Sequence, residues 1–157
     1  EQIVNIKRKQ IYIICDDVLD TFNIGSIFRL ADGAAVSKVY LCKGSETPPN
    51  SRIAKASIGT DKWVPWEYFS DTIDAIAKLR LEVPEVKVLA IEQAKGSVDF
   101  RKVSYEKPIA LVVGHETFGI SEDVLKVCDE IVEIPMFGVN VSLNVMVSLG
   151  IVLFRAI

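Results

Sequence analysis

The sequence contains one histidine and three cysteines in 157 residues. Cys15, Cys42 and Cys128 are far apart and each lies in an apolar stretch, so no Cys-x-x-Cys pair is present. Neither a structural zinc site nor a histidine-based metal site can be assembled from this set. We therefore expect buried free thiols, as in a reducing compartment, and a protein without metal chemistry.

The sequence also lacks an apolar run long enough to cross a membrane. The longest candidate, residues 145–157, carries Arg155 and is shorter than the roughly 20 residues that a spanning helix needs. Residues 1–10 are polar and charged, unlike a secretory signal. We expect a cytoplasmic protein with no membrane partner.

Excess positive charge is missing as well. The formal net charge of -3 argues against a protein that holds nucleic acid by its overall charge alone. Binding would need local patches, of which there are two candidates: Lys7, Arg8 and Lys9, and then Arg52, Lys55 and Lys62. Spacing alone favours the interpretation that these side chains are simply solvated.

Two glycine-rich phosphate-binding motifs do not occur. No G-x-G-x-x-G follows the first apolar run, and no G-x-x-x-x-G-K-[ST] is present. Because these loops cradle the phosphates of dinucleotides and nucleoside triphosphates, their absence disfavours nicotinamide redox chemistry and nucleotide hydrolysis.

What is present is an alternation of short apolar runs with helical periodicity. Strands are predicted at residues 11–15, 38–42, 86–91, 109–113 and 131–134, with an edge or irregular strand within 62–69. Helices are predicted after a cap at Asn23, over 71–81, after a cap at Ser121, and over 142–156, and residues 45–60 predict a long loop with at most a short helical turn. This order predicts an α/β fold with a mainly parallel sheet and helices on both faces.

Glycines and polar residues interrupt the last third of the chain just after two predicted strands. Gly114, His115 and Glu116 follow residues 109–113, and Pro135 to Asn144 follow residues 131–134. In open α/β sheets, ligands bind beyond the carboxyl ends of the strands. These residues therefore predict a binding site.

Each candidate also has a purely structural interpretation. Arg29, in the first helix, is suited to hold a phosphate, but a solvated helix arginine is the commoner case. Glu116 either bonds a ligand or a backbone donor, or faces water. His115 has no Ser, Cys or Asp partner at a recognisable spacing, which favours a loop residue over a base. Ser142 is a candidate cap of the last helix.

Three segments, taken in order, resemble the motifs of the SpoU/TrmH family of RNA methyltransferases, within the SPOUT superfamily. Residues 23–29 are similar to the first motif, residues 111–120 to the second, and residues 134–136 with 142–145 to the third. Residues 56–60, with Trp63 and Val64, are similar to a further family segment. The resemblance runs from about residue 11 to the end of the chain.

The resemblance implies a SPOUT-like α/β fold whose C-terminal segment forms a deep trefoil knot. It also implies S-adenosylmethionine as the methyl donor, and a homodimer with the active site near the interface. On this basis residues 1–157 are expected to be one SpoU-type methyltransferase domain, without the additional N-terminal RNA-binding domain that many members carry.

The resemblance assigns roles to individual residues. Arg29 is expected to carry catalysis, in the same subunit or from the partner, with Asn23, Glu116, Ser142 and Asn144 positioning it or the substrate. The cofactor pocket is expected to be formed by Gly114, His115, Glu116, Ile134, Met136, Ser142 and Leu143.

The implied activity is ribose 2′-O-methylation of tRNA or rRNA. Two alternatives stay open: a non-catalytic RNA-binding or assembly module with the same fold, and a related knotted enzyme that methylates bases. The retained Arg29, Ser142 and Asn144 disfavour the first. The second is disfavoured because residues 23–29 are similar to the ribose-methylating branch.

Overall fold

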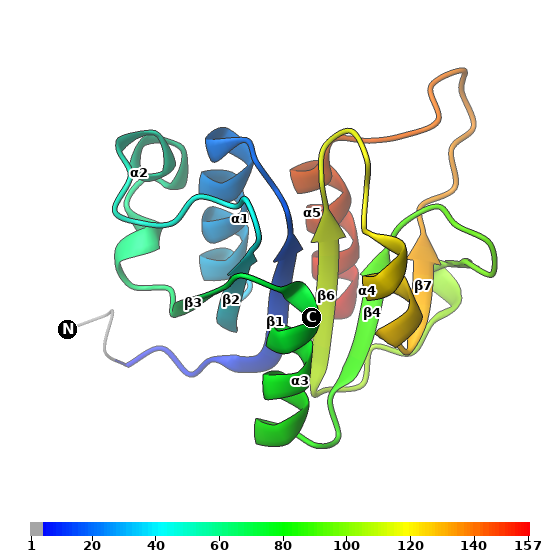
Figure 1. The fold of residues 1–157 in the computed structure, drawn as a ribbon, viewed down its shortest axis with the longest axis horizontal. Helices are drawn as coiled ribbons and strands as arrows, with labels where there is room; N and C mark the ends of the chain where they lie inside the picture. Colours follow the sequence, from blue (N-terminus) through cyan, green and yellow to red (C-terminus); the bar gives the residue numbers. More distant parts are fainter. Residues whose placement is uncertain (1–4) are drawn as a thin grey trace.

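One sheet of seven parallel strands organises the protein (Figure 1). The computed structural model describes residues 5–157, so part of the polar segment 1–10 lies outside it. The strand order is β3-β2-β1-β6-β4-β7-β5. The bounds are β1 (Lys9–Asp16), β2 (Val36–Cys42), β3 (Trp66–Phe69), β4 (Lys87–Ile91), β5 (Val98–Asp99), β6 (Ile109–Gly114) and β7 (Glu130–Glu133).

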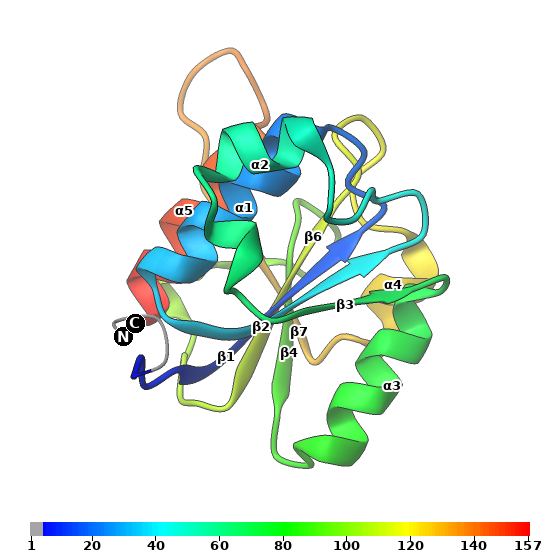
Figure 2. The same ribbon diagram turned by 90° about the vertical axis from the view of Figure 1, so that its left-hand side faces the viewer.

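Helices cover both faces of the sheet, as predicted (Figure 2). They are α1 (Thr21–Gly33), α2 (Ser51–Ser57), α3 (Thr72–Glu82), α4 (Glu122–Val127) and α5 (Val145–Ala156), with 3-10 turns η1 (Thr60–Lys62) and η2 (Phe100–Lys102). Side chains alternate across the pleated strands. Ile13 of β1 thus packs in the core shared with α1 and α5, and Ile14 packs in the core shared with α3 and α4.

Three predicted helix caps were wrong in detail. Asp20, not Asn23, caps α1 by accepting a hydrogen bond from Phe22 N at 2.8 Å. Ser121 precedes α4 as expected, but its side chain makes no capping bond and its hydroxyl donates to Asp16 Oδ2. Asn144, not Ser142, caps α5. The side chains of Asn23 and Ser121 bond distant residues instead, and Ser142 lies two positions before the actual cap of α5. The local sequence does not reveal these differences.

Three short elements, α2, β5 and η2, lie in segments where no strand and at most a short helical turn was predicted. Residues 45–60 contain α2, whose first N–H groups are capped by the Asn50 side chain, so the expected loop is partly helical. The two-residue strand β5 and the turn η2 follow β4. The strand at residues 66–69 is an edge strand, as Pro65 indicated.

The cysteines are free thiols. Cys15 and Cys42 are buried, whereas Cys128 is only partly buried. Burial raises the pKa of Cys42 and that of Cys128 to about 12. Because the thiolate is the reactive form, these side chains act as small apolar groups in the core.

The last segment of the chain packs against elements that come earlier in the sequence. After β7, residues 134–144 leave the sheet as a projecting loop, and α5 then packs against α1 and β6 (Figure 1). This route is consistent with the knot that the resemblance implies. Among residues 5–157, no helix is both long enough and apolar enough to cross a membrane.

Candidate functional site

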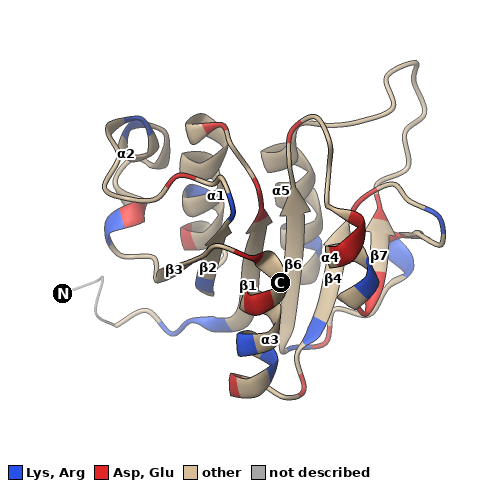
Figure 3. Ribbon diagram, in the orientation of Figure 1, with Lys and Arg blue, Asp and Glu red and all other residues tan. Residues whose placement is uncertain are grey.

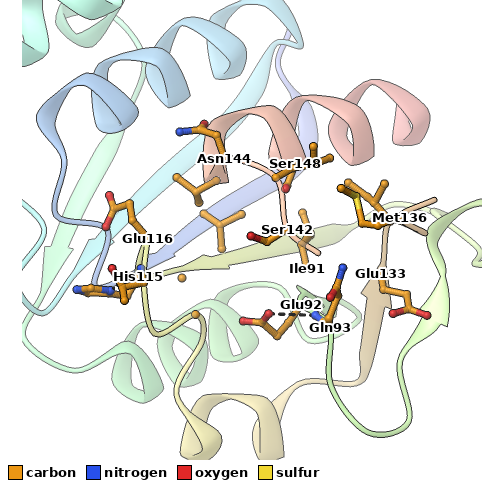
Figure 4. Close-up of a pocket in the computed structure, with 17 residues that line it drawn as sticks. Ile91, Glu92, Gln93, His115, Glu116, Glu133, Met136, Ser142, Asn144 and Ser148 are labelled. Atoms are coloured by element: carbon orange, nitrogen blue, oxygen red, sulfur yellow. Dashed lines mark hydrogen bonds between the residues drawn. The ribbon is translucent and has the colours of Figure 1, made fainter. Parts of the chain in front are cut away.

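A pocket of about 260 Å³ lies beyond the carboxyl ends of β4, β6 and β7 (Figure 4). Parallel strands end at the same edge, so the segments that follow them converge there. The pocket is lined by residues from three stretches, 91–93, 113–119 and 133–145, and by Ser148. Every residue that the resemblance assigned to a cofactor pocket is part of this lining: Gly114, His115, Glu116, Ile134, Met136, Ser142 and Leu143.

A tight turn after β6 forms one wall of the pocket. The backbone groups of His115 and Gly119 bond each other, at 3.1 and 2.9 Å. Gly119 has a φ of 69°, and a Cβ on Gly114 would lie 2.4 Å from the carbonyl carbon of Gly119. Both glycines are therefore required by the geometry of the turn.

His115 stabilises this turn. Its Nδ1 accepts hydrogen bonds from the backbone N–H groups of Thr117 and Phe118, at 3.0 and 3.1 Å. The nitrogen that faces the turn is thus occupied by two donors. His115 therefore helps to fix the conformation of the loop.

Glu116 joins the turn to the connection between β1 and α1. Its carboxylate accepts hydrogen bonds from Leu19 N at 3.1 Å, Asp20 N at 2.9 Å and Asn23 Nδ2 at 3.2 Å. Partial burial raises the pKa of Glu116, but the bonds from Asp20 and Leu19 outweigh it and leave the pKa below its usual range. Glu116 is therefore a carboxylate engaged in positioning the chain.

The same network continues through two asparagines. Asn23 is buried, and its Oδ1 accepts a hydrogen bond from Asn144 Nδ2 at 3.0 Å. The Oδ1 of Asn144 in turn accepts from the first N–H groups of α5, those of Met146 and Val147. Glu116, Asn23 and Asn144, which we call the carboxamide relay, thus connect the three motif segments.

Ser142 and Arg29 lie apart from this relay. Ser142 lines the pocket, and its side chain forms no hydrogen bond to any described residue (Figure 4). Arg29 is exposed on α1, outside the pocket lining, and forms no ion pair or side-chain hydrogen bond within residues 5–157. Within one chain the structure brings together the predicted catalytic residues except Arg29.

Sequence reasoning missed acidic residues at the pocket. Glu92 and Gln93 directly follow β4, and Glu133 ends β7. The Glu92 carboxylate accepts hydrogen bonds from Ile120 N at 2.9 Å and Gln93 N at 3.0 Å, so it also holds the end of the 114–119 turn. The same signal that marked residues 114–116, polar residues directly after an apolar strand, was present at Glu92.

The lining has the chemistry that S-adenosylmethionine requires. That molecule combines an adenosine with a positively charged sulfur and an ammonium group. The pocket offers apolar side chains for the first part, including Ile91, Ile134 and Leu143, and carboxylates for the positive charges. The residues present therefore fit this cofactor. Within the described part of the chain, no group of three or more candidate metal ligands occurs.

Comparison with known proteins gives matches along almost the whole chain. A tRNA (guanosine(18)-2′-O)-methyltransferase from Aquifex aeolicus is 32% identical over 159 residues, covering 99% of this chain and 72% of the relative. A 23S rRNA (guanosine-2′-O-)-methyltransferase from Ralstonia nicotianae is 32% identical over 158 residues, covering all of this chain and 62% of the relative.

Solved structures agree with this similarity. The AdoMet-bound rRNA methyltransferase from Sinorhizobium meliloti superposes with a TM-score of 0.86 at 30% identity. The superposition covers 98% of this chain but only 59% of that one, so this chain spans less than two thirds of some relatives. The SpoU rRNA Methylase family itself matches residues 10–154. The chain therefore belongs to the SpoU rRNA methylase family.

Proposed function

We propose that this protein is an S-adenosylmethionine-dependent RNA methyltransferase that modifies ribose 2′-hydroxyl groups of tRNA or rRNA. The observation that carries the proposal is the pocket at the carboxyl ends of β4, β6 and β7, which all the expected cofactor residues line. The names of the Aquifex and Ralstonia relatives support the same reaction. A cytoplasmic location fits such substrates.

S-adenosylmethionine, when bound, supplies a methyl group on a positively charged sulfur. Gly114, Ile134, Met136 and Leu143 would hold it, with Glu92 and Glu133 contributing negative charge at the pocket. Transfer would form a bond between the ribose oxygen and that methyl carbon and break the bond from the carbon to sulfur, while the hydroxyl proton would leave to water. The protein must align these atoms and stabilise the oxygen as it loses its proton.

We assign that stabilisation to Arg29. A guanidinium stays protonated and offers five N–H donors, so it can bind the neighbouring phosphate and the oxygen at once. It cannot accept the proton, which separates its role from that of a general base. The carboxamide relay would hold the N-terminus of α1 at a fixed position relative to the N-terminus of α5. Ser142 would contact the substrate or the cofactor.

Because Arg29 lies outside the pocket of its own chain, we propose that a second copy supplies it. Apolar side chains are exposed on α1 and α5, where Phe22, Val147, Ile151 and Phe154 are each more than a third accessible. Arg29 and Phe22 are two turns apart on α1, and α5 packs against that helix. A homodimer through this surface would bury these side chains and bring Arg29 to the partner's pocket.

The proposal is tested by transfer of labelled methyl from S-adenosylmethionine to unmodified total tRNA and rRNA, followed by alkaline hydrolysis. A methylated 2′-oxygen blocks cleavage, so ribose methylation leaves label in alkali-stable dinucleotides. Label in mononucleotides would instead identify a base methyltransferase. Binding of RNA without any transfer to either pool would favour a non-catalytic module.

A further inference from the structure

A second pocket, of about 480 Å³, shares no lining residue with the cofactor pocket. It is formed where the segment before α2 meets η1 and β3. Its apolar lining comes from Pro48, Pro49, Ala54 and Trp66. Asp61 and Lys62 border it, and none of the three motif segments contributes to it.

Exposed positive charge lies at and near this second pocket: Lys62 lines it, and Arg52 and Lys55 lie on α2, which contributes Ser51 and Ala54 to the lining. Arg52, Lys55 and Lys62 are exposed, and none of them forms an ion pair or a side-chain hydrogen bond to another described residue. Figure 3 shows Lys and Arg positions in blue on α2 and on the segment that follows it. Some other lysines are paired: Lys38 and Lys78 both pair with Glu67. In a chain with a net charge of -3, unpaired cations beside an apolar pocket indicate a polyanionic ligand with apolar parts.

We propose that the second pocket binds one unpaired nucleobase of the RNA substrate. The base stacks on Trp66, and Arg52, Lys55 and Lys62 contact the phosphates on either side. This inference rests on the proposed function for the presence of RNA. Single-stranded RNA is recognised by such pairing of aromatic platforms with basic side chains, since every base has a face that stacks and every linkage carries a negative charge.

Polar atoms in the pocket suit a base as well. Asp61 is nearly buried, and its Oδ1 accepts a hydrogen bond from Ser57 Oγ at 2.6 Å. Its other oxygen has no hydrogen-bonding partner in the described chain. That oxygen is an acceptor for an N–H group on the edge of a stacked base.

Elements that form the second pocket pack directly against the helix that carries Arg29. A Cβ on Gly25 of α1 would lie 2.5 Å from the Cβ of Ala56, so α1 and α2 pack with their backbones close together. Farther along α1, Asp32 accepts a hydrogen bond from Trp63 Nε1 at 2.7 Å. RNA held at the second pocket is therefore held at a fixed position relative to Arg29.

Fluorescence of the full chain tests this inference with a short oligoadenylate as the probe. The sequence has only two tryptophans, so the Trp63→Phe variant leaves Trp66 as the sole reporter. We expect oligoadenylate to quench the Trp66 emission, and we expect the affinity of the protein for oligoadenylate to fall with added salt. Because Trp66 is itself the reporter, its variants are compared by the fluorescence anisotropy of dye-labelled oligoadenylate. Trp66→Leu should weaken binding about tenfold or more, whereas Trp66→Phe should keep most of it, because a smaller ring still stacks.

Charge removal supplies the matched control. The double variant Arg52→Ala with Lys62→Ala should bind oligoadenylate at least about tenfold more weakly. The exposed pair Lys102→Ala with Lys126→Ala removes the same charge elsewhere and should bind as the parent does. Equal losses in both double variants, or unchanged binding in Trp66→Leu, would overturn the inference.

The test separates this inference from the proposed function. Oligoadenylate binding requires no methyl transfer, so quenching with the expected variant pattern supports the second pocket even if the protein methylates nothing. Conversely, the protein could be active while its Trp66→Leu variant binds RNA with the parental affinity. In that case the proposed function would stand and the inference about the second pocket would be wrong.

Discussion

Asn23 and Asn144 are joined by a hydrogen bond of 3.0 Å although 121 positions separate them in the chain. Asn23 uses its amide nitrogen to bond Glu116 and its oxygen to accept from Asn144. Both ends of one small side chain are therefore committed, and no other residue type of that size provides a donor and an acceptor in this geometry. The relay makes the first and third motifs depend on each other.

Replacing Asn144 should cost both stability and activity. Asn144→Ala removes the α5 cap and the bond to Asn23, and we expect a loss of about 1–2 kcal/mol in the free energy of unfolding. Asn144→Asp keeps an acceptor for the helix N–H groups but removes the donor to Asn23. It should recover much of the stability in urea denaturation while methyl transfer stays low. Full activity in Asn144→Asp would contradict a positioning role for the relay.

The turn after β6 should tolerate no side chain at Gly114. Because an added Cβ would lie 2.4 Å from backbone atoms of Gly119 and Ile120, Gly114→Ala must open the turn. We expect at least about 2 kcal/mol of destabilisation and a loss of S-adenosylmethionine affinity measured by calorimetry. Gly138→Ala is the control, since its Cβ would have no neighbour within 4 Å. A Gly114→Ala protein with parental affinity would show that the turn is not part of the cofactor site.

Arg29 should matter for turnover and not for the fold. It is exposed and forms no side-chain contact by hydrogen bond or ion pair in the described chain, so Arg29→Lys should change stability by less than about 0.5 kcal/mol. Lysine keeps the positive charge but lacks the planar guanidinium with its five N–H donors. The turnover rate should therefore fall to a small fraction of the parental rate, while the affinity for S-adenosylmethionine stays the same. Single-turnover methyl transfer and calorimetry measure the two quantities. Retained turnover would remove Arg29 from the mechanism.

Mixing two inactive variants tests whether the partner supplies Arg29. Arg29→Ala lacks the guanidinium, and Met136→Lys places a positive charge in the pocket proposed for a positively charged cofactor. If sites are shared and subunits exchange at random, about a quarter of the sites regain both intact parts. If Arg29 serves its own chain, the mixture stays inactive.

The proposed dimer surface gives a separate prediction. Ile151 and Leu81 are exposed leucine-sized side chains on α5 and α3, on opposite faces of the sheet. Ile151→Glu should convert a dimer to monomer in sedimentation or light scattering, because the interface would have to bury a charge. Leu81→Glu should leave the mass unchanged. A parental protein that is already monomeric and active would contradict the shared site.

Stability should depend on pH through Asp16. This buried carboxylate accepts hydrogen bonds from Thr72 and Ser121 and pairs with Lys43 at 2.9 Å. Burial raises the pKa of Asp16, but the bonds from Thr72, Lys43 and Ser121 outweigh it, so the pKa lies below its usual value. A depressed pKa contributes stability above the unfolded value of about 3.9, and the contribution disappears as the pH falls through the folded pKa.

Asp16→Asn should therefore lose about 2 kcal/mol at pH 7 and show a flatter decline in acid. Urea denaturation at pH 7 and between pH 4 and 2 measures the difference. Asp74→Asn, at an exposed acid of α3, should follow the parental curve. Parallel curves for Asp16→Asn and the parent would exclude this linkage.

The sequence predicted the sheet better than the helix ends. Buried strands such as residues 109–113 are continuous apolar runs, and that signal is local. Caps are not local: Asn23 and Ser121 both stand at helix starts, yet tertiary partners use their side chains. The family motifs placed the pocket residues, whereas the partners of Glu116 could not be predicted because Leu19 and Asp20 contribute backbone groups that carry no sequence signal.

The position of α5 has a consequence for synthesis of the protein. The pocket at the carboxyl ends of β4, β6 and β7 needs residues of the 133–145 stretch and Ser148, and the relay needs Asn144. A nascent chain on the ribosome can pair β1 with β2 early, but it has no complete pocket until α5 emerges and docks beside α1. A ligand of this pocket can therefore bind only after α5 has been translated and has docked beside α1.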